Sequence, residues 1–200
     1  MEIRGKARSR KPICSGFGIS IRPLRFSNLY PIARSTASRR PWSRTAPKYL
    51  LRVFKALLDT SAYLDVRRAG KNLRSDWAQN TLRHLGEYKS HHPRLSISSF
   101  TAFEILDGLY RGPGAEAAAR FTIEVLPTYE VIYPDAEITY LAAEIHAALA
   151  NARQSIGVAD TFIAATAVAK GMTLVNANTR HFPRIREMGF PIALSNWRDA

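Results

Sequence analysis

The chain has 200 residues, of which 46% are hydrophobic, and this is enough for one domain with a buried core plus an extension. No apolar run approaches the roughly 20 residues that a membrane-spanning helix needs. The single cysteine, Cys14, excludes a disulfide framework and favours a reducing, cytoplasmic compartment.

The basic charge is concentrated at the N-terminus. Residues 1–48 hold twelve of the 29 Lys/Arg and one of the 16 Asp/Glu, a net charge of +11, which leaves 17 bases, 15 acids and a net charge of +2 for residues 49–200. The first segment shows neither helical nor strand periodicity, so we predict a disordered basic extension at 1–48 and a folded domain at 49–200. The extension is compatible with a nucleic-acid-binding arm, an organelle transit peptide, or translation from a start upstream of the true one.

The domain begins with an apolar run, Tyr49–Leu58. The end of this run, Leu57-Leu58, predicts a buried strand, and Asp59 follows it directly. In parallel α/β sheets the carboxyl ends of the strands face the crevice where ligands bind. Asp59 is therefore a candidate site residue, although Asp59 or Ser61 could instead cap a helix over Ala62–Arg67.

Helices and strands alternate through the middle of the chain. The pattern predicts a helix around Leu73–Tyr88, a strand at Leu95–Ser98, a helix at Phe100–Tyr110, helical spacing over Ala115–Glu124, a strand at Tyr129–Tyr133 and a helix at Ala136–Asn151 capped by Asp135. We place Phe103 and Tyr110 on the apolar arc of the third of these segments. Glu104 lies off that arc, so periodicity alone favours a solvated position for it.

The most distinctive segment is Ile156–Phe182. It predicts an Ala-rich helix, Val158–Lys170, that is apolar on every side and closed by Gly171, then a strand at Met172–Val175 and a polar loop at Asn176–His181. Asp160 is the one carboxylate in its first turn. A last strand is expected at Phe190–Leu194. Such alternation implies a parallel sheet covered by helices on both faces.

Four segments together resemble the PIN-domain family, and within it the VapC-type toxins of bacterial toxin–antitoxin pairs. They are Leu57–Ser61 (LLDTS), Ser98–Glu104 (SSFTAFE), Gly157–Ala167 (GVADTFIAATA) and Leu174–Phe182 (LVNANTRHF). The resemblance covers residues 49–200 and leaves residues 1–48 unexplained. It implies a three-layer α/β/α fold with a central parallel sheet.

The resemblance also implies a site. By position, Asp59, Glu104 and Asp160 would be the catalytic acids and metal ligands, with Asn178 where the family often has a further acid. Thr60 could hydrogen-bond the carboxylates, and Arg180 and His181 could contact a substrate phosphate. Asn178 brings no charge, which weakens a second metal position.

The physical chemistry of such a cluster agrees with a metal site. Three carboxylates about 5 Å apart would repel by roughly 3 kcal/mol per pair at an effective dielectric constant near 20. Protons or a divalent cation must neutralise them, and all-oxygen ligands suit Mg²⁺ or Mn²⁺. The expected activity is metal-dependent hydrolysis of RNA phosphodiester bonds, which by similarity to the family would leave a 5′-phosphate and a 3′-hydroxyl.

The resemblance further implies a VapB-type antitoxin partner and a homodimer. The alternative function is a non-catalytic nucleic-acid-binding module that uses the basic N-terminal arm, with a degenerate acidic site. A metal-dependent phosphotransferase of the haloacid-dehalogenase type is disfavoured because Asp59-Thr60-Ser61 lacks that family's second aspartate.

Overall fold

The computed structural model describes residues 54–177 and 180–200, so residues 1–48 of the predicted extension and the predicted ligand Asn178 lie outside the described residues. The elements are β1 (Ala56–Leu58), α1 (Thr60–Ala69), α2 (Asp76–Lys89), β2 (Ser96–Ser98), α3 (Ser99–Arg111), α4 (Ala115–Arg120), a π-helical turn η2 (Phe121–Val125), a 3₁₀ turn η3 (Leu126–Thr128), β3 (Glu130–Ile132), α5 (Ala136–Asn151), α6 (Val158–Ala169), β4 (Thr173–Val175), α7 (Phe182–Glu187) and β5 (Ala193–Ser195). None of the helices in this part of the chain is both long and apolar enough to cross a membrane.

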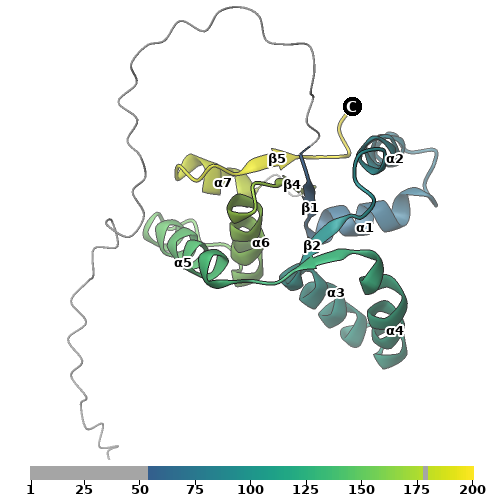
Figure 1. Ribbon diagram of the computed structural model, residues 1–200, viewed down its shortest axis with the longest axis horizontal. Coiled ribbons are helices and arrows are strands. Elements are labelled where there is room, and N and C mark those ends of the chain that lie inside the picture. Colours follow the sequence, from purple (N-terminus) through teal and green to yellow (C-terminus); the bar gives the residue numbers. More distant parts are fainter. Residues whose placement is uncertain (1–53, 178–179) are drawn as a thin grey trace, which may run out of the picture. The chain divides into compact units, whose positions relative to one another are not determined.

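The five strands form one sheet in the order β3-β2-β1-β4-β5, and each neighbouring pair is parallel. Helices α5, α6 and α7 lie on one side of this sheet and α1, α2, α3 and α4 on the other (Figure 1). The predicted three-layer α/β fold with a central parallel sheet is thereby confirmed.

The central strand β1 contributes to both cores. Leu57 packs into the cluster formed with α5 and α6, whereas Ala56 and Leu58 pack into the cluster formed with α1, α2 and α3. Successive side chains of a strand point to opposite faces, so three residues are enough to join the two layers. All three are almost completely buried, which explains the continuous apolar run before Asp59.

Helix α6 is the core helix that its composition predicts. Its side chains from Ile163 to Ala167 are buried, and Gly171 closes the segment with a φ of 60°, a conformation that glycine adopts without strain. The helix ends at Ala169, one residue before the predicted end. Its first turn is not enclosed, because Val158 is 58% exposed.

Two sequence-based predictions need correction, and one helix lies where none was predicted. Helix α7 was not predicted, because its six residues show too little periodicity, and its proline is tolerated in the first turn of a helix. The last strand is Ala193–Ser195 and not Phe190–Leu194. Phe103 and Tyr110 are 61% and 62% exposed, because α3 turns a narrower face, centred on Ala102 and Ile105, towards the core.

An ion pair between a buried Asp65 and a half-exposed Arg198 fastens the C-terminal segment to α1. Asp65 is only 7% exposed, and the Arg198 guanidinium donates to both of its carboxylate oxygens, at 2.6 and 2.7 Å. The Asp65 carboxylate correspondingly holds the pKa of Arg198 above its ordinary value. The same guanidinium lies 5.7 Å from the centre of the Trp77 ring on α2. Trp197, the residue before Arg198, is also buried.

Replacing Arg198 by Ala should lower the free energy of unfolding by about 2–3 kcal/mol, because it leaves the Asp65 carboxylate buried without its partner. The control is Arg111→Ala, which breaks the exposed Arg111–Asp107 pair within α3 and should cost less than about 0.5 kcal/mol. Urea denaturation measures both. Equal losses in the two variants would contradict this account of the C-terminal segment.

Candidate metal centre

Three acids from distant parts of the sequence come together at one end of the sheet. Asp59 follows the last residue of β1, Glu104 lies on α3, which starts directly after β2, and Asp160 lies in the first turn of α6. The negative charges of Asp160 and Glu104 both raise the pKa of Asp59, which places each of these two carboxylates within electrostatic range of Asp59. The structure thus brings together the three acids that the sequence singled out.

Asp59 is the buried member of the group. It is 5% exposed, and its Oδ1 accepts hydrogen bonds from the Ala62 backbone N–H at 2.7 Å and from the Ser61 hydroxyl at 2.8 Å. The capping role considered from the sequence is therefore present, and it does not compete with a place in the acidic group. Desolvation by burial is the main cause that raises the pKa of Asp59 to about 6, against the lowering effect of these two hydrogen bonds.

Glu104 is half-buried and not on a fully solvated face, which corrects the expectation from periodicity. The Thr60 hydroxyl donates a hydrogen bond to its Oε2, so the residue after Asp59 orients the second acid. Helix α3 itself is fixed by its N-cap, because the Ser98 hydroxyl accepts from the Thr101 backbone N–H at 2.9 Å. These contacts fix both acids to neighbouring strands.

Asp160 faces the loop that follows β4. Its Oδ2 lies 2.9 Å from Nδ1 of His181, which stands just before α7. A carboxylate in the first turn of a helix is also stabilised by the partial positive charge of the helix N-terminus. His181 therefore contacts a candidate catalytic acid directly.

Ser61 is a further residue of the site, and the sequence predicted for it only a helix-capping role. Its hydroxyl donates to Asp59 and accepts from the Ala177 backbone N–H at 2.9 Å, so it joins the end of β1 to the loop after β4. The signal in the sequence was a third polar residue in Asp59-Thr60-Ser61. Asn178, the predicted fourth ligand, directly follows Ala177 and lies outside the described residues.

The donor chemistry of this group fits Mg²⁺ or Mn²⁺. All three side chains offer oxygen ligands, which hard cations prefer. Within the described ranges, Oε1 of Glu104 and Oδ1 of Asp160 accept no protein hydrogen bond. No three His, Cys, Asp or Glu side chains of residues 54–177 and 180–200 are close enough to enclose an ion by themselves. Because Mg²⁺ usually keeps several waters and takes only one or two carboxylates directly, the arrangement fits a partly water-mediated site.

The raised pKa of Asp59 predicts a stabilising substitution. In chelator, Asp59→Asn keeps an oxygen that can cap α1 but removes a buried charge. The folded wild type binds the Asp59 proton more tightly than the unfolded chain does, so the stability of the wild type should fall as pH rises from about 4 to about 6. Above that range the variant should be more stable than the wild type, by up to about 3 kcal/mol, and the difference should shrink on acidification.

Urea denaturation in EDTA at about pH 5 and about pH 7.5 measures this difference. The matched control is Asp135→Asn, because Asp135 caps α5 in the same way but is exposed and has a lowered pKa. Its substitution should destabilise the protein more as pH rises, which is the opposite sign. A wild type and an Asp59→Asn variant with identical pH dependence would contradict the assigned burial.

Comparison with known proteins agrees with this geometry. The PIN domain family matches residues 56–188. Ribonuclease VapC1 of Methanocaldococcus jannaschii is 28% identical over 138 residues, which cover 69% of this chain and 86% of that protein.

Two solved structures show the same fold over most of the domain. VapBC2 from Rickettsia felis, bound to a DNA fragment from its promoter, matches with a TM-score of 0.54 and 26% identity, over 71% of this chain and 98% of that one. DNA-bound VapBC from Salmonella typhimurium matches with a TM-score of 0.55 and 25% identity, over 72% and 98%. Since the family match spans well over half of the residues and includes all three acids, the chain belongs to the PIN domain family.

Proposed function

We propose that this protein is a Mg²⁺- or Mn²⁺-dependent endoribonuclease and the toxin of a type II toxin–antitoxin pair. The observation that carries the proposal is the meeting of Asp59, Glu104 and Asp160 at the carboxyl end of the sheet, with the pKa of Asp59 raised by burial and by the other two charges. Similarity to Ribonuclease VapC1 supports RNA as the substrate.

In this proposal Asp59, Glu104 and Asp160 hold the cation, directly or through water, and Asn178 adds a neutral oxygen. When bound, the cation lowers the pKa of a coordinated water and stabilises the charge that develops on the phosphate. Thr60 and Ser61 orient Glu104 and Asp59 through the hydrogen bonds described above. Burial of Asp59 strengthens its interaction with a cation, because nearby water screens it less.

The flanking loop supplies the positive charge that a polyanionic substrate needs. His181 contacts Asp160 and Arg180 precedes it in the chain, and in this proposal both contact a substrate phosphate. Holding the phosphate between a cation site and a basic loop places the scissile bond in a fixed orientation, which accounts for a large part of phosphoryl-transfer catalysis.

The same acids provide a binding site for an inhibitory partner. A guanidinium matches a carboxylate pair in both charge and geometry, so an arginine of a VapB-type antitoxin would compete with the cation. Similar solved structures are VapBC complexes, which supports such a partner. Pull-down of a VapB-type antitoxin by wild-type but not Asp160→Ala protein tests this pairing, and sedimentation tests the proposed homodimer.

Cleavage of RNA should require the divalent cation. The wild type should cut RNA with Mg²⁺ or Mn²⁺ and lose activity in EDTA, and Asp160→Asn and Glu104→Gln should each reduce kcat by at least about 100-fold. Gel analysis of end-labelled RNA measures the rates and the product ends.

Glu116→Gln is the matched control, because Glu116 is an exposed acid on α4 that pairs only with Arg120 among the described residues. It should cleave like the wild type. Activity that persists in chelator, or that survives both Asp160→Asn and Glu104→Gln, would reject the proposed function.

A further inference from the structure

A basic pocket lies at the amino ends of β2 and β3, at the opposite end of the strands from the three acids. Its volume is about 440 Å³, a size typical of small-ligand sites. Arg94 and Leu95 precede β2 and Tyr129 precedes β3, so they stand at the amino ends of parallel strands, whereas Asp59 follows a carboxyl end. The lining residues are Val66, Arg67, Leu85, Lys89, Pro93, Arg94, Leu95, Thr128 and Tyr129.

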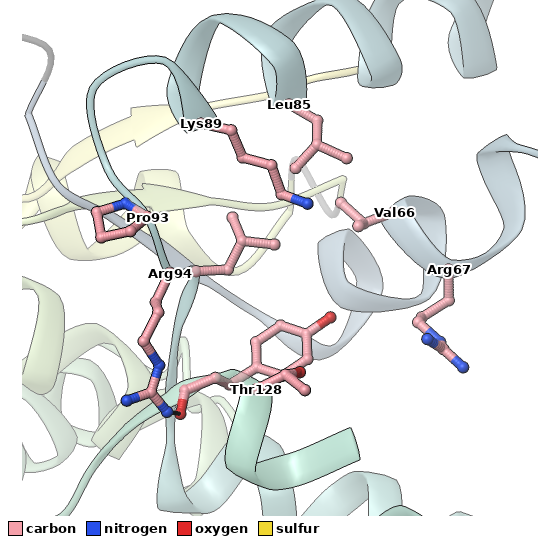
Figure 2. Close-up of a pocket in the computed structure, with 9 residues that line it drawn as sticks. Val66, Arg67, Leu85, Lys89, Pro93, Arg94 and Thr128 are labelled. Atoms are coloured by element: carbon pink, nitrogen blue, oxygen red, sulfur yellow. Dashed lines mark hydrogen bonds between the residues drawn. The ribbon is translucent and has the colours of Figure 1, made fainter. Parts of the chain in front are cut away.

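Three cations surround this pocket. Lys89 extends from α2 towards Val66 on α1, and the guanidinium groups of Arg67 and Arg94 lie at opposite sides (Figure 2). Within the described parts of the chain, neither Arg67 nor Lys89 forms an ion pair with a carboxylate. Arg94 is fixed in place by the carbonyl oxygens of Pro127, at 2.6 Å, and of Tyr129. The pocket therefore carries positive charge that the neighbouring protein does not neutralise.

Tyr129 adds a buried donor. It is 7% exposed, its ring packs 5.6 Å from that of Tyr63, and its hydroxyl has no hydrogen-bond partner in residues 54–177 and 180–200. Among the same residues, Gln154 alone has a side-chain polar atom that is both buried from solvent and without a hydrogen bond. The unpartnered Tyr129 hydroxyl is therefore accessible to solvent, and it opens into the pocket that Tyr129 lines. Burial raises the pKa of Tyr129 to about 12, so this group is a donor at neutral pH.

This combination of groups suits a phosphate better than a carboxylate. A nucleotide offers the negatively charged oxygens of a phosphodiester together with a sugar and a base. An ammonium, a guanidinium and a phenol can bind the phosphate while the sugar and base pack against apolar side chains. Val66, Leu85, Pro93 and Leu95 supply an apolar wall beside the cations. A carboxylate also has two oxygens that share one negative charge, but it brings no sugar and base to contact the apolar side chains of the pocket.

We propose that this pocket binds a backbone phosphate and the adjoining nucleotide of an RNA strand at a point away from the cleaved bond. The proposal deepens the proposed function and rests on it for the identity of the nucleic acid. An RNA strand held at both ends of the β-strands would be bound more tightly than one held at the acids alone, so this pocket sets a minimum length for a good substrate.

Binding to an RNA of about 12 nucleotides, a length within the site sizes of single-strand-binding domains, tests the pocket directly. Asp160→Asn serves as the common background so that the RNA stays intact, and fluorescence anisotropy in Mg²⁺ gives Kd at several salt concentrations. Lys89→Gln should raise Kd about 5–10-fold and reduce the salt dependence by about one ion. Tyr129→Phe should raise Kd about 3–10-fold without changing the salt dependence or the unfolding curve.

Arg120→Gln is the control of equal charge change, because Arg120 is exposed on α4 and pairs with Glu116. It should change Kd by less than about twofold. Wild-type affinity in both pocket variants, or an equal loss in Arg120→Gln, would overturn the proposal. Competition by oligoglutamate at least as strong as that by unlabelled RNA would reassign the pocket to an acidic protein segment, and full displacement by inorganic phosphate would reassign it to the free anion.

Cleavage with the wild-type Asp160 separates this proposal from the proposed function. Lys89→Gln should raise KM for the RNA of about 12 nucleotides and leave kcat unchanged, and it should cleave an RNA of about four nucleotides like the wild type. If no RNA is cleaved by any protein, the proposed function fails while the binding measurements still decide the pocket. Normal cleavage with unaltered KM for the longer RNA would overturn the pocket alone.

Discussion

Electrostatic repulsion among three carboxylates is the constraint on which the arrangement of this domain depends. Asp59, Glu104 and Asp160 are separated by 45 and 56 positions in the chain, yet the charges of the other two raise the pKa of Asp59. The fold offsets the repulsion by holding each acid with a neighbour: Ser61, Thr60 and His181 contact the three in turn. A divalent cation would remove the repulsion, which couples metal binding to stability.

The rest of the structure supports that arrangement. The parallel pairing of β1 with both β2 and β4 puts their carboxyl ends side by side, and the Asp59 N–H donates to the Val175 carbonyl at 3.0 Å. The Ala-rich helix α6 lies within the core and carries Asp160 in its exposed first turn. Small side chains let α6 pack closely on α5, so the acid is held by a well-packed element and not by a loop. At the amino ends of β2 and β3, the segments that precede these strands form the basic pocket together with α1 and α2.

Much of this could be predicted from the sequence because the strongest signals were local. Alternation of apolar runs with helical patterns predicted the parallel sheet, and the resemblance to the PIN-domain family implied that Asp59, Glu104 and Asp160 belong together. Glu104 could not be placed by periodicity, since its position depends on the Thr60 hydroxyl from another element. Helix α7 was too short to show a period, and the exposure of Phe103 depends on how α3 packs. The roles of Asn178 and of residues 1–48 stay predictions.

The claim that distant acids share one ion can be tested most directly by titrating Mn²⁺ into the protein with ¹³C-labelled carboxyl groups. Paramagnetic broadening falls off steeply with distance, so it reports which carboxylates surround the cation. The account predicts that the resonances of Asp59, Glu104 and Asp160 broaden together, before those of exposed acids such as Glu116. Broadening of only one of the three, or of exposed acids at the same Mn²⁺ concentration, would contradict it.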